Sequence, residues 1–216
     1  FEEHLVEGVK YACADRHVRL HFTVSPEHRA LFKALAEKCA PRFVQNEGVQ
    51  LDITFSEQKP STDTVAANPD GTPFRNADGS LLFRPGGHGA LIENLNDLDA
   101  DVVFVKTVDN VCPDRLKADT VTYKQVLAGL LVSLQARAFV YLEELEAGDV
   151  SEERLHEMLQ FVEKDLHCHS DAAEALEGLE LLDYLYCRLN RPMRVCGMVR
   201  NVGEPGGGPF LAYNPD

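Results

Sequence analysis

Two short stretches of the chain carry residue types that could bind a phosphorylated ligand. The first, Arg84–Leu91, places three glycines around His88. The second, Asp101–Asn110, contains an apolar run followed by the carboxylate of Asp109 and the amide of Asn110. In an open α/β sheet, a loop that opens a helix and an acid that ends a strand face one crevice, where ligands bind. Together the two stretches predict a site for a nucleotide and its metal ion.

The glycine-rich stretch predicts a backbone that can approach a ligand closely. Gly86, Gly87 and Gly89 have no side chain in the way. A helix that begins here adds unpaired N–H groups and a partial positive charge, which favour an anion or the carbonyl of a base. His88 can add a hydrogen bond to the ligand. The alternative is a tight turn between a strand and a helix, with no ligand.

The second stretch predicts a divalent metal site. Asp109 follows the apolar run Val102–Val105, which is typical of a central strand buried on both faces. Mg²⁺ takes oxygen ligands and keeps several waters, so one or two carboxylates and the phosphates of a substrate are enough to hold it. Asn110 can donate and accept hydrogen bonds beside it. The alternative is an Asx turn after the strand.

Three further side chains are weaker candidates for binding the ligand. Glu204 lies in the loop Gly203–Pro209, where it could accept hydrogen bonds from a sugar; the alternative is a flexible connection. Arg84 and Lys106 could pair with phosphates, and surface salt bridges explain them equally well. The chain has neither the glycine-lysine phosphate loop nor the glycine-serine-glycine elbow of hydrolases.

The elements that must position these residues begin with a predicted β-α-β unit. Helical spacing of apolar residues in Phe1–Asp15 predicts a helix, and alternation in Val18–Val24 predicts a strand. Ser25 and the proline after it predict the start of a helix that runs to about Cys39 and stops before Pro41. A second strand follows at 49–55. Such a unit normally joins neighbouring parallel strands by a right-handed crossover.

The next region predicts a hairpin or a pair of short strands that lead into the glycine-rich loop. Turn signals occur at Asn68–Gly71 and Asn76–Gly79, with short apolar pieces around them. We find no internal repeat in the sequence. Ala90–Leu98 predicts a short helix that starts in the loop.

After Pro113 the pattern becomes helical. The predicted helices are Thr120–Glu146, which ends at Gly148, then Ser151–Lys164, and Ala172–Leu189 with Asp171 or Ser170 as its cap. Met193–Val199 predicts a returning strand. These patterns divide the chain into an α/β core at 1–112, a helical region at 113–190 and a returning part of the core at 191–216.

Composition limits the classes of partner. The chain has 216 residues and a net charge of −14, with no long basic run, which argues against binding nucleic acid or an anionic membrane. No apolar run approaches the roughly 18 residues of a membrane span. The six cysteines are scattered and predict reduced thiols rather than a disulfide framework. We therefore expect a cytoplasmic protein with a small phosphorylated ligand; the oligomeric state stays open.

Two motifs resemble those of the UDP-sugar pyrophosphorylases. Pro85–Leu91 resembles their stretch of a proline, a glycine, an asparagine or histidine, another glycine and a leucine, and Val108–Asn110 resembles their strand that ends in Asp-Asn. Phe55–Gln58 resembles a further stretch more loosely. The resemblance implies that Gly87, His88 and Gly89 lie along the uridine base. It also implies that Asp109 holds Mg²⁺ and the phosphates.

Almost the whole chain is similar to a bacterial family named domain of unknown function 4301, itself similar to nucleotidyltransferases. The stretches that carry this resemblance begin at Thr62, Phe83 and Gly203. It implies an α/β fold with a mostly parallel, Rossmann-like sheet of the nucleotidyltransferase (GT-A-like) type and a helical insertion.

The implied reaction joins a nucleoside triphosphate to a sugar 1-phosphate and releases pyrophosphate. The glycine-rich loop that grips the triphosphate in pyrophosphorylases has no match in Phe1–Asp15. We therefore expect a fragment of a longer chain that is catalytically incomplete by itself. The alternative is a binding module for a nucleotide or sugar phosphate, without turnover.

Overall fold

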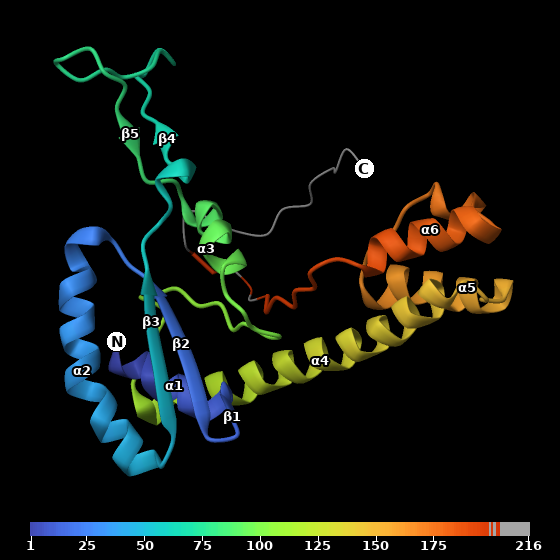
Figure 1. The fold of residues 1–216 in the computed structure, drawn as a ribbon, viewed down its shortest axis with the longest axis horizontal. Helices are drawn as coiled ribbons and strands as arrows, with labels where there is room; N and C mark the ends of the chain where they lie inside the picture. The colour runs from blue at the N-terminus through green and yellow to red at the C-terminus, as the bar shows by residue number, and fades with distance from the viewer. Residues whose placement is uncertain (199, 201, 204–216) are drawn as a thin grey trace. The chain divides into compact units, whose positions relative to one another are not determined.

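A β-α-β unit, as predicted, lies at the centre of the amino-terminal part of the chain. The computed structural model describes residues 1–198, 200, 202 and 203. The elements of the unit are β1 (Cys13–Ala14), β2 (His17–Thr23), α2 (Pro26–Glu47) and β3 (Gln50–Ser56). β2 and β3 pair in parallel, and β1 pairs antiparallel with β2. The sheet has three strands in the order β1-β2-β3 (Figure 1).

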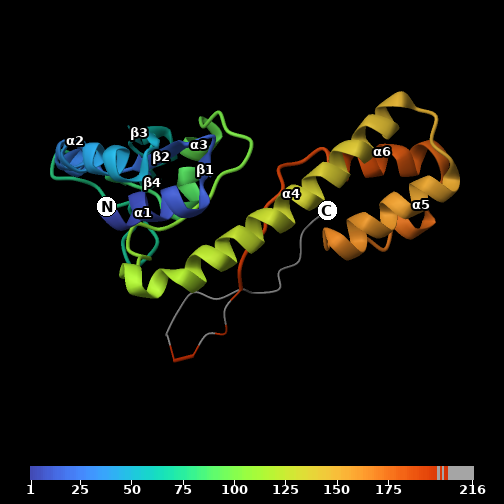
Figure 2. The ribbon, with the colours of Figure 1, turned by 90° about the horizontal axis from the view of Figure 1, so that it is seen from below.

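The two faces of this sheet differ because side chains alternate along each strand. The apolar face packs against α1 (Glu2–Tyr11) and α2 (Figure 2). Leu5, Cys39 and Phe43 are buried there in a common cluster. The other face is polar. There both ring nitrogens of His21 lie 2.8 Å from hydroxyls of β3, those of Thr54 and Ser56.

The predicted end of α2 before Pro41 is wrong, because the helix continues to Glu47. Pro41 removes one helix hydrogen bond and crowds the preceding turn. Packing outweighs this cost, since Ala36, Cys39 and Phe43 form a buried stripe while Pro41 lies on the exposed face. The helix ends instead at Gly48, whose φ of 64° suits a left-handed cap.

The predicted hairpin is present and contains a repeat that the sequence analysis missed. The paired strands are β4 (Thr64–Val65) and β5 (Phe83–Arg84), preceded by the short turn η1 (Pro60–Thr62). The three eight-residue copies are Thr64–Gly71 (TVAANPDG), Thr72–Gly79 (TPFRNADG) and Ser80–Gly87 (SLLFRPGG). The copies share mainly a hydroxyl residue at the first position and a glycine at the last position. The repeat is therefore difficult to recognise in the sequence.

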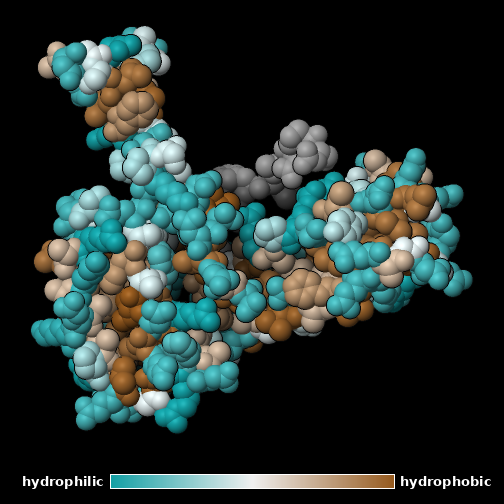
Figure 3. All heavy atoms as spheres, viewed as in Figure 1, coloured by the Kyte–Doolittle hydropathy of each residue, from teal (hydrophilic) through white to brown (hydrophobic). Residues whose placement is uncertain are grey.

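Backbone hydrogen bonds join the three copies in a closed cycle. Phe74 N–H donates to Ala66 O at 2.7 Å, Leu82 N–H to Phe74 O at 3.2 Å, and Ala66 N–H to Leu82 O at 2.9 Å. Each copy is thus bonded to both others. Apolar side chains gather on this hairpin (Figure 3), where Val65, Phe74 and Phe83 are exposed.

The helix predicted after the glycine loop forms as a 3-10 turn, η2 (His88–Leu91), followed by α3 (Ile92–Asn96). The strand predicted at Val102–Val105 is wrong. That segment is extended, with every second residue partly buried, but it has no strand partner among the described residues. It packs on α1, where the rings of Tyr11 and Phe104 lie 4.9 Å apart. The alternating burial of this segment therefore results from its contact with a helix, and not from a place in a sheet.

The carboxy-terminal part contains a helical core. Its elements are α4 (Lys117–Ala147), which follows the turn η3 (Asp114–Leu116), then α5 (Glu152–Gln160), the π-turn η4 (Phe161–Asp165), the 3-10 turn η5 (Ala173–Ala175) and α6 (Gly178–Leu189). Tyr141 of α4, Met158 of α5 and Leu181 of α6 are buried in one cluster. The expected helix start at Asp171 or Ser170 is wrong, because α6 begins at Gly178.

The predicted fold class is also wrong. The sheets of the described residues have three and two strands, and only β2 and β3 pair in parallel, so a mostly parallel Rossmann-like sheet is absent there. The described part of the returning strand, 193–198, is irregular. The two compact units are Phe1–Val121 and Thr122–Asp216. Most regular structure of the described residues is helical, and the extended piece Val102–Val105 packs on α1 instead of joining the sheet.

Candidate functional site

The glycine-rich loop connects β5 to η2, and its first glycine is required by the fold. A Cβ atom at Gly86 would lie 2.9 Å from the carbonyl oxygen of Thr62 and 2.9 Å from the Cβ of Ala90. Any side chain would therefore push the loop away from both neighbours. The alternative of a tight turn without a ligand explains this glycine fully.

Gly87 and Gly89 have no such explanation in the described structure. A Cβ atom at either position would meet no atom within 4 Å. Neither residue has a positive φ; that of Gly87 is −70°. Neither packing nor backbone conformation therefore requires glycine at these two positions. Glycine there leaves the backbone open to a molecule from outside.

The loop lines a pocket of about 350 Å³. Its walls are Gln58, Gly86, Gly87, His88 and Leu91. The structure thus brings together three of the four residues predicted to bind the nucleotide. Gly89 is the next residue of the same turn. Among the described residues, the N–H groups of Gly87 and His88 donate to no other group, so they remain available to a ligand.

The side chain of Gln58, which lies just after β3, is hydrogen-bonded to the first glycine of the loop. With its amide oxygen turned toward Gly86, Gln58 accepts a hydrogen bond from Gly86 N–H at 2.7 Å and from the Thr62 hydroxyl at 3.1 Å. Its amide nitrogen donates to Gly86 O at 3.2 Å. Sequence analysis noted Gln58 only as part of a loosely similar stretch, because the pairing joins residues far apart in the chain.

Asn94 of α3 is a second residue that sequence analysis missed. Its side chain is buried, and its amide nitrogen donates to the Ser56 hydroxyl at 2.9 Å and to Glu57 O at 2.8 Å. Its amide oxygen has no partner among the described residues. The only signal in the sequence is an asparagine within a short apolar helix, which is too common to indicate a role.

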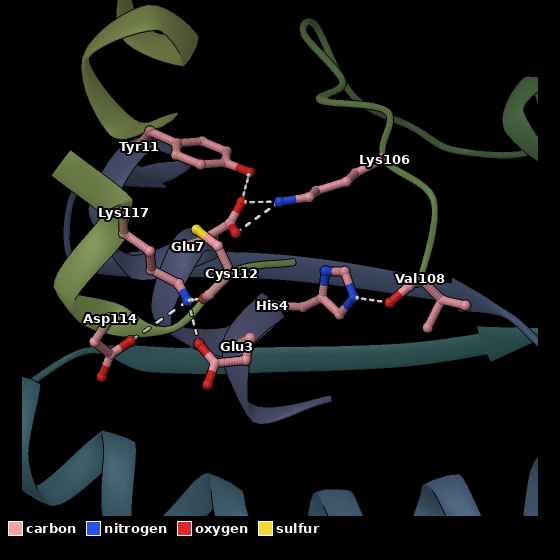
Figure 4. A network of polar contacts seen from close by, with 9 residues as sticks. All are labelled: Glu3, His4, Glu7, Tyr11, Lys106, Val108, Cys112, Asp114 and Lys117. Carbon is pink, nitrogen blue, oxygen red and sulfur yellow. Dashed lines mark hydrogen bonds and ion pairs between the residues drawn. The ribbon is translucent and has the colours of Figure 1, made fainter. Parts of the chain in front are cut away.

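Asp109 and Asn110 lie in a separate loop that α1 holds. Both are exposed in a turn in which Asn110 N–H donates to Thr107 O. The loop is tied to α1 by His4, whose Nε2 lies 3.0 Å from Val108 O (Figure 4). Neither Asp109 nor Asn110 is a wall of the glycine pocket. Their predicted position at the end of a central strand is wrong, since that strand does not form.

A buried ion pair holds the same loop at Lys106, two residues before Val108. Lys106 Nζ lies 2.6 Å from Glu7 Oε1, and the Tyr11 hydroxyl donates to the same carboxylate at 2.8 Å (Figure 4). The Glu7 side chain is 1% exposed. Lys106, a predicted phosphate partner, is therefore committed to Glu7 in this structure.

This environment lowers the pKa of Glu7. Burial alone raises it, but hydrogen bonds from Lys106 and Tyr11 and the positive charge of Lys106 together outweigh burial. Burial and the neighbouring carboxylate raise the pKa of Tyr11.

A second attachment lies farther along the chain, where Lys117 of α4 is buried and hydrogen-bonds to Glu3 and to the carbonyl of Cys112. The loop that carries Asp109 is thus attached to α1 at both ends.

The other predicted residues lie apart. Arg84 is exposed at the end of β5, and Glu204 lies outside the described residues. Within the described chain, no group of three or more His, Cys, Asp or Glu side chains is arranged to hold a metal ion. Magnesium therefore stays a prediction that depends on Asp109 and on oxygens of the ligand.

Comparison with known families identifies the chain. A family model described as domain of unknown function (DUF4301) matches residues 1–216. The chain belongs to the DUF4301 family. No curated protein and no solved structure matches it significantly, so the resemblance to UDP-sugar pyrophosphorylases gains no support. The DUF4301 chain has to be interpreted from its own geometry.

Proposed function

We propose that this DUF4301 chain binds a nucleotide or sugar phosphate at the Gly86–Gly89 loop. One observation carries the proposal: Gly87 and Gly89 are glycines that neither packing nor backbone conformation requires. A pocket lined by Gln58 and Leu91 lies beside them. Free N–H groups favour a ligand that presents acceptor oxygens, such as a base carbonyl or a phosphate.

Transfer between a nucleoside triphosphate and a sugar 1-phosphate stays a prediction. It would need a metal-bound triphosphate, and the pocket walls contain no carboxylate. Asp109, the predicted metal ligand, belongs to a different loop. The pocket by itself supports ligand binding. Catalytic turnover would depend in addition on a metal ion held by Asp109.

The proposal predicts that alanine at Gly87 or Gly89 weakens binding without harming the fold. A methyl group at either position meets no protein atom but would occupy the backbone surface offered to the ligand. Stability should stay constant or rise by about 0.5 kcal/mol, because alanine reduces the entropy of the unfolded chain. Calorimetry with UTP and Mg²⁺ should show at least about a tenfold loss of affinity, equivalent to roughly 1.4 kcal/mol.

Gly129→Ala is the matched control, since Gly129 in α4 is also open and should tolerate alanine without loss of UTP affinity. Gly86→Ala should instead destabilise the fold, because its methyl group meets Thr62 and Ala90. Asp109→Ala, measured with and without Mg²⁺, tests the metal separately. Failure of the whole chain to bind UTP, CTP, ATP, GTP and glucose 1-phosphate, or binding unchanged in both glycine variants, would contradict the proposed function.

A further inference from the structure

The loop of the candidate site is the third turn of the eight-residue repeat. In the first two turns an aspartate accepts hydrogen bonds from the N–H and hydroxyl two residues later. These bonds run from Thr72 to Asp70 and from Ser80 to Asp78, with N–H distances of 3.0 and 2.9 Å. In the third turn the aspartate position is Gly86 and the hydroxyl position is His88. The third turn therefore lacks the side chains that close the other two.

The backbone of the third turn differs accordingly. Gly71 and Gly79 close their turns with φ values of 83° and 84°, whereas the equivalent Gly87 has a φ of −70°. The first two turns are satisfied by their own side chains. The third turn stays open and depends on groups from elsewhere in the fold.

Gln58 supplies the missing hydrogen bonds at the start of the loop. Its amide bonds to both the N–H and the carbonyl of Gly86, and its oxygen also accepts from Thr62. The amide oxygen thus has two donors, and the nitrogen has a backbone acceptor. The protein thus uses three of the four hydrogen-bonding positions of this amide, although the side chain forms a wall of the pocket.

Asn94 holds the helix that follows the loop. Its amide nitrogen bonds to Ser56 and to the carbonyl of Glu57, both at the carboxyl end of β3. The end of β3 and the two residues after it therefore anchor the loop on both sides, through Gln58 before the glycines and through Asn94 after them. Two anchors in one short segment hold the loop before any ligand arrives.

We infer that Gln58 and Asn94 are positioning residues that pre-organise the Gly86–Gly89 loop, and that neither recognises the ligand directly. The inference rests on the proposed function. A loop already held in its bound conformation loses less entropy on binding, which raises the affinity for every ligand that uses its backbone. A side chain that recognises a base would instead favour one base over the others.

The test compares four nucleotides in the whole chain. Gln58→Met keeps the length of the side chain and removes its three hydrogen bonds; Gln45→Met, exposed on α2, is the matched control. Calorimetry with UTP, CTP, ATP and GTP should show that each affinity falls by about the same factor, on the order of tenfold, with the ratios between nucleotides unchanged. An altered ratio, or an affinity equal to that of the control, would overturn the inference.

Hydrogen exchange of the Gly86 amide tests the anchoring without a ligand. Exchange should be faster in Gln58→Met than in the parent chain and intermediate in Gln58→Glu, which can accept from Gly86 but cannot donate to it. Asn94→Ala should weaken nucleotide binding uniformly, whereas Asn96→Ala, exposed on the same helix, should not. Gln58→Glu also serves if the methionine variant does not fold.

The two proposals fail in different ways. If the parent chain binds neither a nucleotide nor a sugar phosphate, the proposed function is wrong, and Gly86 exchange still decides whether Gln58 holds the loop. Unchanged exchange in both Gln58 variants would overturn the anchoring, whatever the parent chain binds.

Discussion

Glycine has different causes at neighbouring positions of one loop. At Gly86 the reason is internal, because Thr62 and Ala90 leave no room for a methyl group. At Gly87 and Gly89 the protein offers no reason of its own. A glycine-rich sequence is equally compatible with both causes, close packing inside the protein and close approach of a ligand. Only the neighbouring atoms separate a glycine that packing requires from a glycine that a ligand would require.

Glu7 gives a prediction at the same scale. Its pKa is lower in the folded chain, so its stabilising contribution is complete above the unfolded value near 4.5 and is lost as the pH falls through the folded value. Glu7→Gln should lower the free energy of unfolding by about 3 kcal/mol at neutral pH, because Lys106 loses its partner in a buried site.

Urea unfolding between about pH 7 and 3 measures this effect, since the difference between the parent and Glu7→Gln should shrink in acid. Glu37→Gln, on the exposed face of α2, is the control and should stay within about 0.5 kcal/mol of the parent. A pH-independent difference would mean that the charge of Glu7 is irrelevant to its role.

At the scale of elements, packing decides where helices end. Sequence rules place the end of α2 before Pro41, yet the buried stripe through Cys39 and Phe43 carries the helix past it. Likewise the unbroken apolar run Val102–Val105 predicts a strand buried on both faces, but only every second side chain is partly buried, and the segment meets α1 and not a second strand. Local patterns identify residues that favour burial, while the partner that covers them depends on the rest of the fold.

Pro41→Ala should therefore stabilise the chain. Alanine restores the missing N–H hydrogen bond of α2 and loses little packing, because Pro41 is exposed. We expect the free energy of unfolding in urea to rise by about 1–3 kcal/mol. Glu37→Ala on the same face is the control. A decrease for Pro41→Ala would show that the proline ring makes a contact that stabilises α2.

At the scale of the whole molecule, α4 raises the question of a membrane. The helix together with its first turn, Asp114–Ala147, is long and apolar enough to span a bilayer by length and composition, with a mean hydropathy of 1.4 in its most apolar window. The sequence expectation rested on uninterrupted apolar runs and so did not identify it. However, Arg137 of this helix pairs with Asp165 at 2.9 Å and lies 4.5 Å from the centre of the Phe161 ring. Tyr141 and Leu145 are buried in the helical core.

We expect α4 to stay out of the bilayer, although only 11% of its most apolar window is buried within the chain. In flotation with phosphatidylcholine–phosphatidylglycerol vesicles, the chain should remain in the dense fraction, because Arg137 would have to leave Asp165 and enter the bilayer, where a charged side chain near the middle costs about 2.5–3.5 kcal/mol. Co-flotation of the parent chain that Leu130→Lys abolishes would contradict this and would identify α4 as the inserting segment.

Sequence by itself determined the local parts: the β-α-β unit, the turns of the hairpin, the long α4 and the glycine-rich loop as a candidate site. These depend on periodicity and on residues such as Gly148, which act within a few positions. Tertiary structure alone decided that Asp109 belongs to a loop on α1 and that Gln58 and Asn94 hold the glycine loop. It also showed the cycle that joins the three repeats. Such contacts join residues distant in the chain, and their energy depends on which surfaces meet, a property that no local window contains.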